Sequence, residues 1–219
     1  MSFEIFTFGT SYADTLLIQM VDDHDLEVIE KEISYIQELT EGRNFCLKAV
    51  KVKNWNQDLT PWPAPAVFGK EGFGNGAAMT LGFLRQEVLP PLSDGVEEGP
   101  KRIFIGGYSL AGLFSLWAGY QTDRFDGIAA ASPSIWFPLF FDYMQKNKIR
   151  TEAVYLSLGD REEKTRNPVM AQVGNVIRNA EAILREGGTD CILEWNQGNH
   201  FKEPDLRTAK AFAWLMNRG

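Results

Sequence analysis

The feature that most constrains the fold is a regular alternation of short apolar runs with longer amphipathic stretches of helical period. Such alternation predicts βαβ units, a mostly parallel sheet and helices on both of its faces, which is an α/β fold. The expected strands are residues 3–8, 16–21, 44–52, 102–105, 127–131, 153–158 and 191–195. The expected helices are residues 25–39, 75–89, 110–120, 136–145, 167–185 and 204–216.

The composition fits a single globular domain over residues 1–219. Apolar residues make up 44% of the chain and charged residues 23%, close to the averages of globular domains. The chain shows no internal repeat, no low-complexity segment and no linker between two parts. Because α/β folds often form one unit of this length, one domain is the economical interpretation.

The charge restricts the partners. The chain has 22 Lys and Arg against 29 Asp and Glu, a net charge of -7. An acidic surface repels phosphate, so nucleic acid is excluded as a partner and anionic membranes are disfavoured. No run reaches the roughly 18 apolar residues that a membrane span requires. We expect no membrane contact.

The location is inferred from the first residues and the cysteines. The first residues lack the basic and long apolar regions of a signal peptide. Cys46 and Cys191 lie in strand-like runs without metal-ligand spacing, so buried free thiols are expected. This combination suits a reducing compartment, and we expect a cytoplasmic protein.

Residues 53–74 form an irregular stretch that is rich in Trp, Pro and Gly. Loops of this length are usually functional or disordered, and the aromatic residues argue against disorder. Trp55 and Trp62 of this stretch, with Phe68 and the later Trp136, are candidates for the walls of a substrate pocket. Packing of a wrapped loop into the core is the alternative for each of them.

The motif with the clearest chemistry is GGYSLAG, residues 106–112, between an expected strand and an expected helix. It matches the nucleophile elbow G-x-S-x-G, with Ala111 in the last small position, and predicts that Ser109 points out at the carboxyl end of the sheet. The N–H of Leu110 would be one oxyanion donor, and a second is expected after residues 16–21, near Asp22. A glycine-rich packing turn is the alternative, whereas a dinucleotide fingerprint would require glycine in place of Ser109.

A serine nucleophile needs a base and an acid, and the chain order supplies both. His200 is one of only two histidines and lies between the last expected strand and the last expected helix. The other, His24, is expected in a surface loop. The acid should follow the strand at residues 153–158, where Glu162 stands three residues after Gly159. Asp160 and Glu163 are the alternatives for the acid.

Four segments together resemble the putative-esterase branch of the α/β-hydrolase superfamily, which includes esterase D and the siderophore esterases. The segments are GGYSLAG, ASPSIWF, SLGDREEK and GNHF, which span most of the second half of the chain. The first half matches by strand order alone. The resemblance implies an α/β-hydrolase fold with little or no lid, and a hydrolase with Ser109 as nucleophile, His200 as base and Glu162 as acid.

The function that we expect is therefore serine esterase activity on a small-molecule ester, with no cofactor and no metal. A thioesterase or peptidase with the same three residues is an alternative, because the sequence does not distinguish the leaving group. A hydrolase-fold binding protein without activity is the alternative outside enzymes, since fold alone does not decide function. A homodimer is a possible assembly that the sequence neither favours nor excludes.

Overall fold

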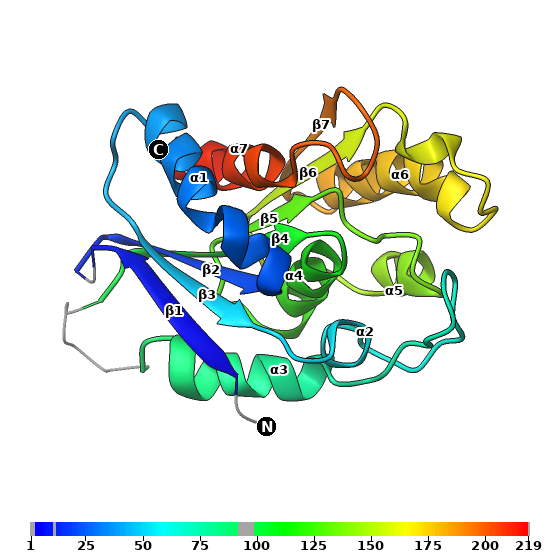
Figure 1. The fold of residues 1–219 in the computed structure, drawn as a ribbon, viewed down its shortest axis with the longest axis horizontal. Coiled ribbons are helices and arrows are strands. Elements are labelled where there is room, and N and C mark those ends of the chain that lie inside the picture. The colour runs from blue at the N-terminus through cyan, green and yellow to red at the C-terminus, as the bar shows by residue number, and fades with distance from the viewer. Residues whose placement is uncertain (1–2, 11, 92–98, 219) are drawn as a thin grey trace.

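The computed structural model describes residues 3–10, 12–91 and 99–218, and a seven-stranded sheet forms its centre (Figure 1). The strands are β1 (Glu4–Gly9), β2 (Thr15–Val21), β3 (Cys46–Lys51), β4 (Arg102–Tyr108), β5 (Gly127–Ala131), β6 (Ala153–Gly159) and β7 (Asp190–Asn196). Their order in space is β1-β3-β2-β4-β5-β6-β7, with β1 antiparallel to β3 and all other neighbours parallel. The predicted mostly parallel sheet is confirmed.

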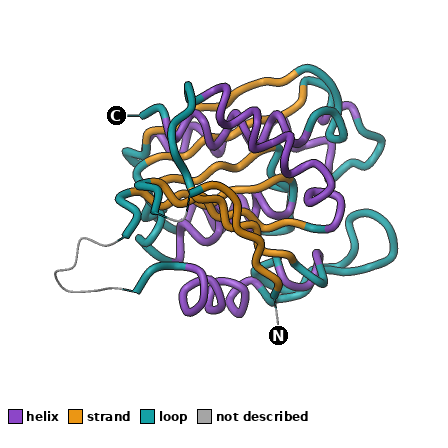
Figure 2. Tube along the Cα trace, turned by 60° about the vertical axis from the view of Figure 1, so that its left-hand side comes forward, coloured by secondary structure: helices purple, strands orange, loops and turns teal. Residues whose placement is uncertain are grey.

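Helices cover both faces of the sheet, as Figure 2 shows from a second direction. The α-helices are α1 (Asp23–Leu39), α2 (Trp55–Asp58), α3 (Ala77–Phe83), α4 (Leu110–Gln121), α5 (Phe140–Lys146), α6 (Val173–Glu186) and α7 (Pro204–Met216). A π-helical turn, η1 (Leu84–Val88), extends α3, and two 3₁₀ turns, η2 (Glu162–Lys164) and η3 (Met170–Gln172), precede α6.

The two faces bury separate apolar clusters because side chains alternate along each strand. Leu17 of β2 belongs to the cluster with side chains of α1 and α7 on one face, and its neighbour Ile18 belongs to the cluster with side chains of α3, α4 and α6 on the other. In β2 every residue is buried, as expected for a strand covered on both sides.

Two helices begin at least four residues later than the sequence predicts. The helix expected at residues 136–145 begins at Phe140, because Leu139 before it has a left-handed backbone with φ 65°. The helix expected at residues 167–185 begins at Val173, after the 3₁₀ turn η3. Both starting segments carry side chains of the cavities described below.

The irregular stretch predicted at residues 53–74 is ordered by packing. It contains α2 and a bridge between Ala64 and Phe73. The indole N–H of Trp62 donates to the carbonyl of Pro138 at 2.9 Å, and the hydroxyl of Thr80 donates to the carbonyl of Asp58 at 2.7 Å. These bonds tie the first half of the stretch to the segment before α5 and to α3.

Two further sequence expectations concern the cysteines and membrane helices. Cys46 and Cys191 are buried and free, as predicted. Among the helices within residues 3–10, 12–91 and 99–218, none is long and apolar enough to cross a membrane.

Candidate active site

Ser109 occupies the single position between β4 and α4. Its backbone has φ 57° and ψ −118°, a region that residues other than glycine rarely adopt. Gly107 makes the turn fit, because a Cβ there would lie 2.5 Å from the Cβ of Ala111. The small residues that the motif predicts are therefore a packing requirement of the strand and the helix.

Backbone hydrogen bonds fix this turn on both sides. The N–H of Ser109 donates to the carbonyl of Ala131 at 3.1 Å, and its carbonyl accepts from the N–H of Ser134 at 3.0 Å. Leu110 is the first residue of α4, so its N–H has no partner within the helix. The positive end of the helix dipole thus lies beside the Ser109 hydroxyl.

The structure brings Ser109, His200 and Glu162 together in one line. The distance from Ser109 Oγ to His200 Nε2 is 3.0 Å, and the distance from His200 Nδ1 to Glu162 Oε2 is 2.7 Å. The two alternative acids point elsewhere. Asp160 Oδ1 accepts from the N–H of Gly198 at 2.8 Å, and Glu163 Oε2 lies 3.4 Å from Arg178.

The carboxylate of Glu162 is almost fully enclosed and well satisfied. Its Oε1 accepts from the N–H of Gly159 at 2.7 Å, from the hydroxyl of Ser132 at 2.8 Å and from Arg207 at 2.9 Å. Burial by itself raises the pKa of Glu162. The hydrogen bond and charge of His200, with the bonds from Gly159 and Ser132, outweigh it and lower the pKa below its usual value. The carboxylate therefore stays ionised beside the imidazole.

Two serines of the site were not singled out from the sequence. Ser134 Oγ lies 3.1 Å from Ser109 Oγ, and Ser132 binds Glu162 from a backbone with φ 42°. Both belong to the ASPSIWF segment, directly after β5. The position of this segment after the strand that neighbours β4 is the signal that could have identified them.

A buried arginine is the other residue that sequence reasoning missed. Arg207 of α7 is 2% exposed and lies against Glu162 and the hydroxyl of Tyr108. Its signal is a charge among the apolar side chains of the last helix, a place where unpaired charges are costly.

Asp22 does not lie in an open oxyanion loop. It is the N-cap of α1, which begins at the next residue, so β2 passes into the helix without a loop. The N–H of Asp22 donates to the carboxylate of Asp25 at 3.1 Å, and the N–H of Asp25 donates to Asp22 at 2.8 Å. This reciprocal capping box occupies the N–H that was expected to bind an oxyanion, and the prediction for Asp22 is therefore corrected.

A cavity of about 220 Å³ adjoins His200 and Glu162. Its walls include the aromatic side chains of Trp136 and Phe201, and two cations, Arg161 and Lys164. The site thus has apolar surface and positive charge on the side of the imidazole.

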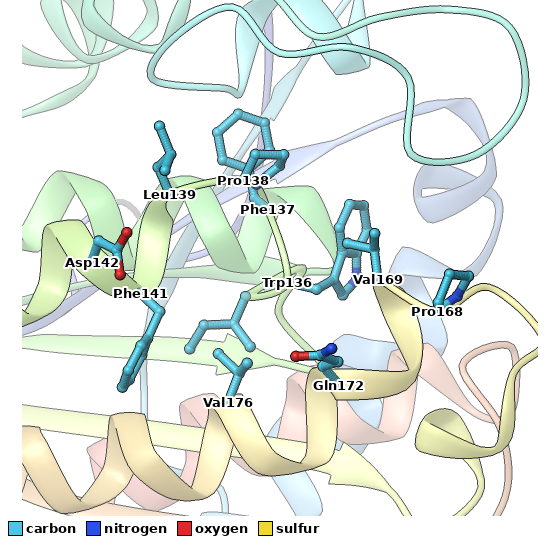
Figure 3. A pocket seen from close by; sticks show the side chains of 11 residues that line it. Trp136, Phe137, Pro138, Leu139, Phe141, Asp142, Pro168, Val169, Gln172 and Val176 are labelled. Atoms are coloured by element: carbon cyan, nitrogen blue, oxygen red, sulfur yellow. The ribbon is translucent and has the colours of Figure 1, made fainter.

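A second cavity, of about 360 Å³, is lined mostly by apolar side chains, with Asp142 and Gln172 as polar ones, between the segment before α5 and the start of α6 (Figure 3). Trp136 lines both cavities, and Figure 3 labels it among the residues that line the second one. Of the other three predicted pocket residues, Phe68 packs edge-on against Trp136 with ring centroids 5.8 Å apart. Trp62 packs on Phe137 with ring centroids 5.6 Å apart, and Trp55 packs against the larger core cluster. The core-packing alternative describes the surroundings of Trp55 and Trp62.

Comparison with known proteins gives one family and many similar folds. The family model described as Putative esterase matches residues 48–187, more than half of the chain. No curated protein sequence matches significantly.

Three solved structures illustrate the fold. An IroE-like serine hydrolase from Shewanella oneidensis has a TM-score of 0.76 at 16% identity, over 98% of this chain and 75% of that chain. The siderophore hydrolase EstA from Aspergillus nidulans has a TM-score of 0.70 at 17% identity, over 98% and 94%. The enterobactin esterase FES from Shigella flexneri, with 2,3-di-hydroxy-N-benzoyl-serine, has a TM-score of 0.62 at 16% identity, over 97% and 55%. The predicted α/β-hydrolase fold is confirmed.

Proposed function

The chain belongs to the Putative esterase family and is a hydrolytic enzyme. From this premise we propose that it is a serine esterase that cleaves a small-molecule carboxylic ester through an acyl-enzyme intermediate on Ser109. The observation that carries the proposal is the line of two hydrogen bonds from Ser109 through His200 to Glu162, at 3.0 and 2.7 Å.

In this mechanism His200 Nε2 takes the proton of the Ser109 hydroxyl as Oγ attacks the ester carbonyl. Glu162 accepts the hydrogen bond from Nδ1–H, which fixes the tautomer and stabilises the imidazolium. The imidazolium then protonates the leaving alcohol. Water, deprotonated by the same imidazole, releases the acid and restores Ser109. The turn between β4 and α4 thereby acts as a nucleophile elbow.

The oxyanion of the tetrahedral intermediate needs hydrogen-bond donors, and two are proposed. One is the N–H of Leu110, which has no partner within α4. The other is the hydroxyl of Ser134, 3.1 Å from Ser109 Oγ, which takes the place of the occupied Asp22 N–H. Such donors commonly contribute about 3–4 kcal/mol each to the transition state.

The lining of the cavity beside His200 favours one substrate class. Trp136 and Phe201 offer aromatic surface, and Arg161 and Lys164 offer positive charge. We infer an ester whose acyl or alcohol part carries an aromatic ring with an anionic or phenolic oxygen. The 2,3-di-hydroxy-N-benzoyl-serine present in the structure of the enterobactin esterase FES carries a ring of this kind. A homodimer is a further proposal from the sequence that awaits a solution measurement.

The test uses a fluorophosphonate probe, which reacts with an activated serine. Wild-type protein should be labelled, and Ser109→Ala should not. Ser34→Ala is the matched control, because Ser34 is an exposed serine on α1 whose hydroxyl only bonds the carbonyl of Glu30, and it should be labelled like wild type. No label on wild type, together with no hydrolysis of any ester, would support the inactive binding protein instead.

A panel of substrates then separates the chemical classes. p-Nitrophenyl esters of increasing length, matched thioesters and anilides are compared by kcat/KM, and the proposal requires the esters to be preferred. Among the esters, an anionic benzoyl ester should have a higher kcat/KM than its neutral counterpart. A preference for the thioester or the amide would replace the ester proposal with the corresponding alternative.

A further inference from the structure

A fourth side chain, Arg207 of α7, joins the parts of the site that carry the acid and the base. Its guanidinium is 2% exposed and makes five hydrogen bonds. Nη1 donates to Tyr108 Oη at 3.1 Å, to Ser132 Oγ at 3.2 Å and to Glu162 Oε1 at 2.9 Å, and Nη2 donates to the carbonyls of Gln197 at 3.3 Å and Asn199 at 3.0 Å. Burying an arginine this deeply is unfavourable unless its donors are satisfied, and here five acceptors satisfy them.

These bonds hold the loop of His200 from two directions. Arg207 binds the carbonyl of Asn199, the residue directly before the histidine. The hydroxyl of Tyr108, which accepts from Arg207, donates in turn to the carbonyl of His200 at 2.6 Å. Burial raises the pKa of Tyr108 to about 12, so this hydroxyl keeps its proton at neutral pH. The backbone that carries the imidazole is thus tied to β4 and α7.

The same cation orients the acid. Arg207, Ser132 and the N–H of Gly159 all donate to Oε1 of Glu162, which leaves Oε2 for Nδ1 of His200. The carboxylate therefore cannot rotate without breaking several hydrogen bonds.

The end of β6 is shaped to admit this arginine. A Cβ on Gly159 would lie 3.0 Å from both terminal nitrogens of Arg207 and 2.4 Å from the carbonyl oxygen of Gly198. A glycine at position 159 is therefore required for the guanidinium to approach the backbone so closely.

We propose that Arg207 is a positioning residue that locks Glu162 and the His200 loop into one geometry and balances the carboxylate charge beside the imidazole. This inference rests on the function proposed above for Ser109, His200 and Glu162. It adds a charge whose removal has a predictable sign: without Arg207, the uncompensated carboxylate holds a proton on His200 more strongly.

Other charged and titratable groups near His200 are Glu162, Tyr108, and the cations Arg161 and Lys164 of the adjoining cavity. They are unchanged in the variants below, so a shift between variants reports the charge at position 207.

The first experiment compares three variants by steady-state kinetics on a p-nitrophenyl ester between pH 5 and 9. Arg207→Gln should lower kcat on the order of 10–100-fold with little change in KM, as for other buried groups that orient catalytic side chains. The acidic side of its pH–rate profile should move to higher pH by on the order of one pH unit. Arg207→Lys keeps the positive charge but loses the planar, branched set of donors that the guanidinium provides. The acidic side of its pH–rate profile should therefore stay at the wild-type pH, while its kcat should lie between those of Arg207→Gln and wild type.

The control is Lys210→Gln, which also removes a cation from α7. Lys210 donates to Glu194 and Asn196 and does not contact the site, so its variant should retain the wild-type pH–rate profile and kcat. An equal shift in Lys210→Gln would overturn the proposal, since any lost charge on α7 would then suffice.

A second readout does not need turnover. The chain has two histidines, so imidazole NMR follows His200 directly, with the exposed His24 as internal reference. In Arg207→Gln, His200 should titrate at higher pH while His24 is unchanged. If wild type hydrolyses no ester but this shift occurs, the proposed function fails and the positioning role stands. Unchanged titration and unchanged kcat in a folded Arg207→Gln overturn the inference. If that variant does not fold, full wild-type kcat in Arg207→Lys overturns it.

Discussion

At the scale of single residues, Ser109 is held in an unfavourable conformation. A residue other than glycine with positive φ costs about 1–3 kcal/mol, and here φ is 57°. The conformation persists because both sides of the turn are hydrogen-bonded, to Ala131 and to Ser134. This strained backbone conformation directs the Ser109 hydroxyl toward His200. The orientation of one side chain is therefore obtained at a cost in the free energy of folding.

This strain predicts a difference between two inactive variants. Ser109→Gly should be more stable than Ser109→Ala by about 1 kcal/mol, because glycine adopts positive φ without a steric cost. Chemical denaturation measures both free energies of unfolding. Equal stability, or a more stable alanine variant, would contradict the claim that the turn is strained.

The second residue-scale prediction concerns the acid. Glu162→Gln keeps the shape of the side chain but removes its charge, so kcat should fall by up to about 10⁴-fold, as when the acid of a serine protease triad is neutralised. Glu163→Gln is the matched control, because Glu163 faces Arg178 at the surface and should leave kcat near the wild-type value. Comparable losses in the two variants would reassign the acid.

The third concerns Ser134. Ser134→Ala removes the proposed side-chain oxyanion donor and should lower kcat by about 10²–10³-fold with little effect on KM. Ser115→Ala, on α4 with its hydroxyl bonded only to the carbonyl of Ala111, controls for loss of a buried hydroxyl. A Ser134→Ala variant with wild-type kcat would remove this residue from the proposed mechanism.

At the scale of elements, α1 buries a carboxyl group against the sheet. Glu32 of α1 is buried, and within the described part of the chain its carboxyl group has one hydrogen-bond partner, the side-chain amide of Gln19 in β2, at 3.3 Å. Burial raises the pKa of Glu32 well above 4.5, and the neighbouring Asp25 and Asp205 raise it further. The contact between α1 and α7 therefore brings carboxyl groups together, and Glu32 holds its proton more strongly than a solvated carboxyl group does.

The sign of the resulting pH dependence follows from linkage. A carboxyl group with a raised pKa in the folded protein binds protons more tightly there, so its stabilising contribution is complete below its unfolded pKa near 4.5. That contribution is lost as the pH rises toward the folded pKa. Glu32→Gln cannot titrate, so it should melt at a higher temperature than wild type at pH 8, and the difference should shrink toward pH 5. Glu30→Gln, on the exposed side of α1, should show no such pH-dependent difference.

At the scale of the whole molecule, the parallel order of the strands assembles the site. Ser109 follows β4, Ser132 follows β5, Glu162 follows β6 and His200 follows β7, and these four strands are consecutive neighbours in the sheet. Carboxyl ends of parallel strands lie along one edge, so residues far apart in the chain meet there.

We propose that residues 1–219 unfold as one domain, which the sheet suggests because β2, from the first half, pairs with β4 from the second. Thermal unfolding followed by tryptophan fluorescence and by far-UV circular dichroism should give one coincident transition. The tryptophans lie in both halves of the chain, so each half contributes to the fluorescence. Two separated transitions would require two domains.

The sequence by itself determined the alternation of strands and helices, the serine turn and the order of Ser109, Glu162 and His200 along the chain. Periodicity and turn composition are local properties, and the order of the strands places the ends of β4, β6 and β7 at one edge. The positions of Ser109 and His200 followed from these patterns alone, as did Glu162 as the first of three candidate acids.

The tertiary structure decided which groups actually touch. It brought Glu162, and neither Asp160 nor Glu163, against His200, because side-chain direction in a turn depends on the bonds around it. In it the Asp22 N–H is hydrogen-bonded to Asp25 in a capping box, and Arg207 of α7 lies against Glu162. Such contacts depend on the packing of one element against another, which neither period nor composition encodes.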